Sequence, residues 1–172
     1  MAETFNWSQT YGSSPGTAVD LGSTGNLFNF KTVDDATAGN YTTNPITASD
    51  TVDQGRSFEV WMRAHFTGTF TSITNIQFWR SSDFSPATGL TLYWNGVQTS
   101  YVTPIQIDST IATSTVPTAD PGTANVSIGG SLAGTLSSAG YTDYIVLQLD
   151  VASTCPSGDT SLAGFTLQYD VV

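Results

Sequence analysis

The residues that could carry out acid–base or nucleophilic chemistry are few in this sequence. It contains one histidine, His65, and one cysteine, Cys155. Nucleophilic catalysis needs a base beside the nucleophile, and that base is most often a histidine. His65 lies in a run of alternating apolar and polar residues, on the same side as Glu59 and Arg63. We interpret it as an exposed or interface histidine, with a catalytic base as the alternative.

The fourteen acidic residues are the second group that could do chemistry, and most of them stand beside turn-forming residues. Asp in such a setting commonly accepts a backbone hydrogen bond in an Asx-turn. Glycoside hydrolysis would need two carboxylates paired across a cleft, and a zinc site would need more His and Cys ligands than this chain offers. The sequence therefore predicts no enzymatic activity and no cofactor. Clustered loop oxygens leave a loop-bound calcium ion open as an alternative.

The charge balance restricts the partners. Four basic residues, Lys31, Arg56, Arg63 and Arg80, stand against fourteen acids, which gives a net charge of −10. A nucleic-acid-binding protein needs a basic surface to replace the counterions on phosphate, and anionic membranes repel an acidic protein. We therefore expect neither nucleic acid nor membrane among the partners, and we expect partners that are neutral or basic.

The N-terminal sequence predicts synthesis in the cytoplasm. Residues 1–7 lack the basic and apolar regions of a signal peptide, and no run approaches the roughly 20 apolar residues of a membrane span. A single cysteine excludes an intrachain disulfide, so we interpret Cys155 as a small apolar filler.

Alternating apolar and polar residues predict the elements that must position these side chains. Period-two alternation is plain at residues 57–66, 144–150 and 164–172, as expected for strands with one face in a core. Weaker strand patterns occur at residues 4–11, 27–31, 70–73, 75–79, 90–94, 101–107 and 125–128. Together they predict one all-β domain over residues 1–172, a jelly-roll-like β-sandwich of about 8–10 antiparallel strands.

Two kinds of connection are expected between these strands. Asn95-Gly96 predicts a hairpin turn after residues 90–94, because a type I′ turn needs positive φ at both central residues. The polar segments 34–55 and 108–123 are longer than a hairpin needs, so we expect them to cross between the two sheets.

Several aromatic side chains lie opposite the apolar residues of their strands. Trp61 and Trp79 do so by alternation, and Trp94 stands beside the expected hairpin turn. Three interpretations remain open for them: a second buried face, a protein–protein interface built on large rings, or a surface that stacks on sugars.

A set of segments over residues 40–172 resembles the small virion structural proteins of tailed bacteriophages and related archaeal viruses, which are similar in size to head-decoration (cement) proteins. The segments are NPITA at residues 44–48, RSFEVWMR at 56–63, ITNIQFWR at 73–80, VPTADPGTAN at 116–125, GYTDYIVLQL at 140–149 and LQYD at 167–170.

The resemblance implies a capsid decoration protein that is made in the host cytoplasm and lies on the outer capsid surface, where it stabilises the head. Such proteins commonly form trimers, so the implied partners are the major capsid protein and further copies of the chain. Residues 1–15 would form an N-terminal arm that makes intersubunit contacts by adding a strand to a neighbour's sheet. The residues expected at interfaces are Phe5, Trp7, Trp61, Arg63, His65, Trp79 and Trp94.

Two other functions remain open. One is a carbohydrate-binding or receptor-binding β-sandwich of a tail fibre, with tryptophans as the stacking surfaces. The other is a structural subunit of a tail or another appendage.

Overall fold

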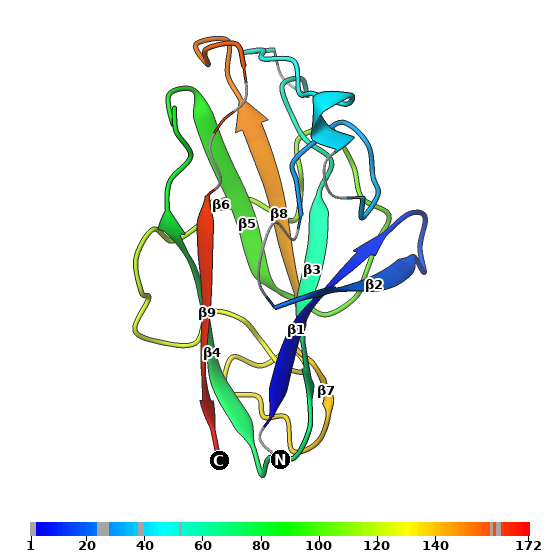
Figure 1. Ribbon diagram of the computed structural model, residues 1–172, viewed down its shortest axis with the longest axis vertical. Helices are drawn as coiled ribbons and strands as arrows, with labels where there is room; N and C mark the ends of the chain where they lie inside the picture. The colour runs from blue at the N-terminus through cyan, green and yellow to red at the C-terminus, as the bar shows by residue number, and fades with distance from the viewer. Residues whose placement is uncertain (1–2, 24–27, 38–39, 52, 159, 161–162) are drawn as a thin grey trace.

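The computed structural model describes residues 3–23, 28–37, 40–51, 53–158, 160 and 163–172, and within them the protein is all-β (Figure 1). The strands are β1 (Thr4–Tyr11), β2 (Thr17–Gly22), β3 (Val60–Thr67), β4 (Ile73–Ser82), β5 (Leu90–Gln98), β6 (Ser114–Thr115), β7 (Gly140–Tyr141), β8 (Tyr144–Val151) and β9 (Gly164–Val171). One short 3-10 helix, η1, spans Asn40–Thr42.

The strands form two antiparallel sheets that pack face to face. The large sheet has the order β2-β1-β3-β8-β5-β6, with β7 also paired to β3, and the small sheet consists of β4 and β9. Figure 1 shows the small sheet, in green and red, along one side of the large one. The predicted all-β sandwich is therefore confirmed, and a jelly-roll connectivity remains a prediction.

Strand alternation places the core between the sheets. On β3, Val60, Met62, Ala64 and Phe66 are all buried and point toward the small sheet. The centre of this core is aromatic: the ring of Phe78 on β4 lies 5.5 Å from Phe165, 5.8 Å from Trp94 and 5.9 Å from Trp7, measured between ring centroids. These rings account for the inward faces that the alternation predicted.

The outer face of the large sheet is covered over part of its area by residues 99–113, here called the covering loop. Trp61 is fully buried beneath it, with its ring centroid 5.2 Å from that of Tyr101. Ala112 and Ile111 pack on the same cluster. Burial raises the pKa of the Tyr101 phenol, so the hydroxyl stays protonated and donates to the backbone oxygen of Gly12 at 2.6 Å. The central strands are therefore buried on both faces.

The hairpin turn expected at Asn95-Gly96 is wrong. Strand β5 continues to Gln98, and the two residues lie at an irregularity in its pairing with β8. Asn95 Oδ1 accepts a hydrogen bond from the backbone nitrogen of Val97 at 2.8 Å. A Cβ atom on Gly96 would lie 2.4 Å from the Asn125 backbone oxygen, so the glycine is needed for close approach of two backbones rather than for a turn.

Other local predictions also differ from the structure. Residues 75–79 lie within β4, whereas residues 101–107 belong to the covering loop and form no strand. Residues 28–31 and 125–128 form no strand either, and residue 27 lies outside the described residues. Segment 34–55 joins two strands of one sheet. Segment 108–123 does reach the other sheet, where Pro117 accepts a backbone hydrogen bond from Arg80 at 2.8 Å.

The N-terminal strand does not form a free arm in this structure. Residues of β1 pair with β2 on one side and with β3 on the other. Residues 7–10 are thus paired on both sides within the chain's own sheet, whereas residues 4–6 pair with β3 alone. Intersubunit contacts of this segment remain a prediction. Residues 1–2 lie outside the described residues.

Candidate interaction site

The residues expected at interfaces fall into two groups by burial. Trp7, Trp61 and Trp94 are 6%, 0% and 8% exposed and belong to the chain's own cores. The partly exposed members are Phe5, Arg63, His65 and Trp79. Phe5 packs edge-on against Trp7 at 5.1 Å between ring centroids, and Trp79 lies on the small sheet opposite Thr166. Among the partly exposed members, Arg63 and His65 are the two that contact one common side chain, Tyr141.

Arg63 and His65 point outward from β3, beyond the part of the sheet that the covering loop buries. The guanidinium carbon of Arg63 lies 3.9 Å from the ring centroid of Tyr141 and 4.8 Å from that of Tyr144. The His65 ring stacks on the same Tyr141 ring at 4.1 Å, with 13° between the planes. Tyr141 thus contacts both basic side chains and limits their rotation.

Strand register adds two polar residues to this group. Ser8 on β1 stands directly opposite Arg63 and also opposite Asp20 on β2. Asp20 Oδ2 lies 3.2 Å from His65 Nδ1. Directly opposed residues in a sheet point to the same face, so Ser8 and Arg63 share the outer face. We call Ser8, Asp20, Arg63, His65, Tyr141 and Tyr144 the Arg63 site.

Two polar atoms of the Arg63 site are buried without a hydrogen-bond partner among the described residues. They are the hydroxyl oxygen of Ser8, whose residue is 1% exposed, and Nε of Arg63. Buried polar atoms are satisfied in the great majority of native structures. Both atoms are enclosed by the protein, so they are unsatisfied groups of the fold rather than donors open to a ligand.

The other basic residues of the chain are paired with its own aspartates. Lys31 Nζ lies 2.6 Å from Asp35 Oδ1, and Arg80 Nη1 lies 3.0 Å from Asp83 Oδ1. Arg56 forms ion pairs with two aspartates. Over the part of the chain that the structure describes, Arg63 is the one basic side chain without an acidic partner, although acids outnumber bases fourteen to four.

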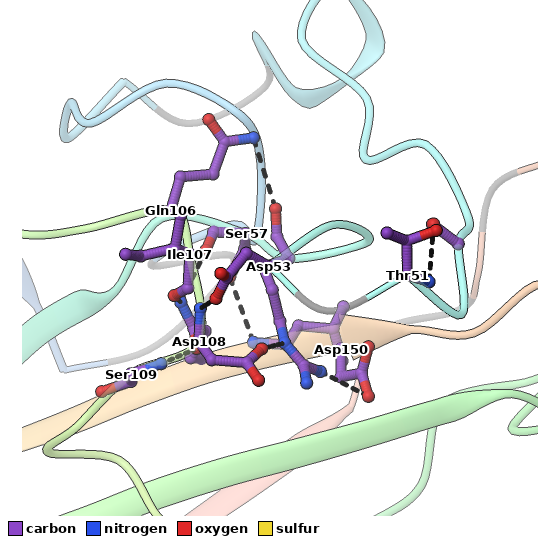
Figure 2. Close-up of polar contacts among 12 residues, drawn as sticks. Thr51, Asp53, Ser57, Gln106, Ile107, Asp108, Ser109 and Asp150 are labelled. Carbon is purple, nitrogen blue, oxygen red and sulfur yellow. Dashed lines mark hydrogen bonds and ion pairs between the residues drawn. The ribbon is translucent and has the colours of Figure 1, made fainter.

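The Arg56 network attaches the covering loop to the sheet (Figure 2). Arg56 Nε donates to Asp108 Oδ1, and Nη1 lies against Asp150 Oδ2 as an ion pair. The backbone nitrogen of Asp108 donates to Asp53 Oδ1 at 3.2 Å. Gln148 adds a neutral attachment, because its Nε2 donates to the Ile107 oxygen at 2.8 Å and its Oε1 accepts from the Ser109 nitrogen at 3.0 Å.

An open depression of about 440 Å³ lies beside this network, lined by parts of segments 46–49 and 53–56 together with Thr32, Gln106 and Ile107. Its one cationic lining residue, Arg56, already serves as the partner of Asp108 and Asp150. The charges of Arg56 are thus used inside the fold, so we assign the network a structural role.

The Arg63 site contains the acid and the imidazole base of a catalytic triad, but it lacks an available nucleophile. Asp20 and His65 form an acid–imidazole contact, as in hydrolytic triads. Ser8, which carries the serine hydroxyl of the site, is almost fully buried and makes no hydrogen bond to His65. The arrangement therefore does not provide the nucleophile–base contact that acyl transfer needs.

The described residues contain no group of three or more His, Cys, Asp or Glu side chains placed to hold a metal ion. Among them, no helix has the length and apolar character needed to cross a membrane.

Comparison with known proteins adds no relative. No protein-family model matches the chain, and neither the curated proteins nor the solved structures contain a match.

Sequence reasoning found part of the Arg63 site and missed the rest. Alternation along β3 placed Arg63 and His65 on one face. Tyr141, Tyr144, Ser8 and Asp20 were not selected. The alternation of β8 does place Tyr144 opposite the core residues, which is a usable signal. The contact of Tyr141 with Arg63 joins residues 78 positions apart, and no local pattern indicates it.

Proposed function

We propose that this chain is a non-enzymatic capsid decoration protein that oligomerises and binds the outer surface of a viral head, with the major capsid protein as its partner. The resemblance of residues 40–172 to virion proteins is the starting point. The observation that carries the proposal on the structural side is Arg63, which stacks on two tyrosine rings and has no acidic partner among the described residues.

Arginine and tyrosine are the residue types that dominate binding energy at protein interfaces. Two tyrosine rings hold the Arg63 side chain in one orientation, so little further side-chain entropy is lost when a partner binds. In a chain of net charge −10, an arginine left unpaired by its own acids is best explained by an acid on another molecule. Binding at such a surface requires an interface and no reaction.

The proposal is tested with heads of the virus whose genome carries the gene, stripped of their decoration. We expect the wild-type chain to co-sediment with these heads, and Arg63→Ala to bind at least about tenfold more weakly, as for a typical interface hot spot. Arg80→Ala is the matched control, because Arg80 already has Asp83 as a partner. Light scattering after size-exclusion chromatography checks the oligomer. Failure of the wild-type chain to bind the heads rejects capsid decoration, and a monomer at all concentrations rejects oligomerisation.

A carbohydrate-binding or receptor-binding domain of a tail fibre is the second candidate, and the outer face of the small sheet favours it. Trp79 is the one tryptophan that is not buried, and Gln77 on the same face has a buried Oε1 atom without a partner among the described residues. Exposed Gln168 stands opposite Gln77. A tryptophan on the same sheet as the exposed Gln168 amide suits a sugar, which stacks on the ring and bonds to that amide. Glycan-array binding that is lost in Trp79→Ala and kept in Arg63→Ala would support this function over decoration.

A further inference from the structure

We infer that the Arg63 site binds a single carboxylate, presented by a loop of a partner protein whose surface around that carboxylate is neutral or basic. This deepens the proposed function by naming the chemistry of the partner, and it relies on that function only for which protein the partner is. No acid among the described residues is paired with Arg63. The acids that form ion pairs there do so with Lys31, Arg56, His65 or Arg80.

The shape of the donor group favours a carboxylate. A guanidinium group is planar and presents its N–H donors in a fork that matches the two oxygens of a carboxylate. The two tyrosine contacts fix the plane of the Arg63 fork. Nε is enclosed by the protein and has no partner among the described residues, whereas neither Nη atom is among the buried unpaired atoms. A partner's carboxylate would therefore approach the two Nη atoms at the end of the fork.

Ser8 lies directly opposite Arg63, but its hydroxyl is enclosed by the protein and has no partner among the described residues. A partner's carboxylate cannot reach this hydroxyl, so the binding group of the site is the Arg63 guanidinium.

The surrounding charges favour a monoanion over phosphate. One guanidinium is present, and the side chain of Asp20 is 48% exposed on the neighbouring part of the face. Phosphate groups and nucleic acids carry more charge and are bound by several cations together. The net charge of −10 opposes such ligands further.

The position of Asp20 indicates which charge the partner surface should carry beside the carboxylate. It lies on β2, two strands away from Arg63 on β3, with β1 between them. Adjacent strands are about 4.8 Å apart, so β2 and β3 are separated by about 10 Å. A partner with a carboxylate and a cationic side chain about 10 Å apart would pair with Arg63 and Asp20 together, which gives the site charge complementarity in both signs.

The test is a titration of the isotope-labelled full chain followed by NMR, with N-acetylglutamate as the probe. We expect the Arg63 Nε–Hε resonance to shift and saturate, while those of Arg56 and Arg80 shift little, because both already have acidic partners. N-acetylglutamine, which has the same shape without the charge, should cause no saturable shift. In Arg63→Lys, which retains the charge and loses the planar fork, binding should weaken at least about tenfold.

Several outcomes would overturn the inference. They are the absence of a saturable shift, equal shifts with N-acetylglutamine, tighter binding of inorganic phosphate, or an Arg63 shift that depends only on protein concentration and so identifies a second copy as the occupant. The amide spectrum of each variant shows whether it folds. If heads bind the wild-type chain and Arg63→Lys equally, the carboxylate site fails and capsid decoration stands. If N-acetylglutamate binds to the chain and the heads do not, the carboxylate site stands and capsid decoration fails.

Discussion

Arg56 lies just before strand β3 and Arg63 lies within that strand, yet their surroundings are opposite. Arg56 is neutralised by Asp108 and Asp150 and attaches the covering loop (Figure 2). Arg63 rests on Tyr141 and Tyr144 and has no acidic partner among the described residues. Acids are abundant in the chain, so their number does not explain the difference.

The path of the covering loop explains the difference between the two arginines. This loop carries Asp108 to Arg56 and buries Trp61, and it packs on Tyr144 without bringing an acid to Arg63. One outer face is thereby divided into a covered part, which stabilises the fold, and a partly open part, where Arg63 has no acidic partner among the described residues. The comparison teaches that the path of one loop determines which basic residue of an acidic chain is neutralised within the fold.

The largest expected effect is in the covered part. Trp61→Ala removes a fully buried ring and leaves a cavity, so we expect the free energy of unfolding to fall by about 3–5 kcal/mol. Urea unfolding followed by circular dichroism measures it. Trp79→Ala is the matched control, because Trp79 is partly exposed, and should cost far less. Equal losses for the two variants would show that the covering loop does not bury Trp61 in solution.

Arg56→Ala should have the next largest effect. Removing one partner of a buried ion pair costs about 3–5 kcal/mol, but Asp108 is 45% exposed, so solvent screening lowers the expected loss to about 2 kcal/mol. The same unfolding experiment measures it. Proteolysis within residues 99–113 should also become faster, since the loop loses one of its attachments. In the double variant with Asp108→Asn, the second change should add little, because its partner is already absent.

Arg63→Ala should have the smallest effect on stability. It removes contacts with two tyrosine rings, each worth about 0.5–1 kcal/mol at a partly exposed site. It also removes a buried Nε atom without a partner, whose presence is itself unfavourable. These terms oppose each other, so the net change should stay below about 1 kcal/mol. A loss as large as that of Arg56→Ala would mean that Arg63 has a structural partner, and the contrast between the two arginines would disappear.

Much of the secondary structure could be predicted from local patterns. The alternation of apolar residues correctly located β3, β8 and β9, and it placed Arg63 and His65 on one face, because side-chain direction in a strand depends only on sequence spacing. The expected turn at Asn95-Gly96 failed since a glycine required for close contact with Asn125 has the same local appearance as a glycine required for positive φ.

The sequence by itself determined that this is an acidic all-β chain with two-sided strands and few residues able to do chemistry. Only the tertiary structure decided that Trp61 is buried, that Arg56 is neutralised and that Arg63 has no acidic partner among the described residues. Each of these depends on contacts between residues about 40 to 80 positions apart, such as Trp61 with Tyr101, Arg56 with Asp108, and Arg63 with Tyr141. Local alternation reports which face a side chain takes, and the packing of distant segments determines what covers that face.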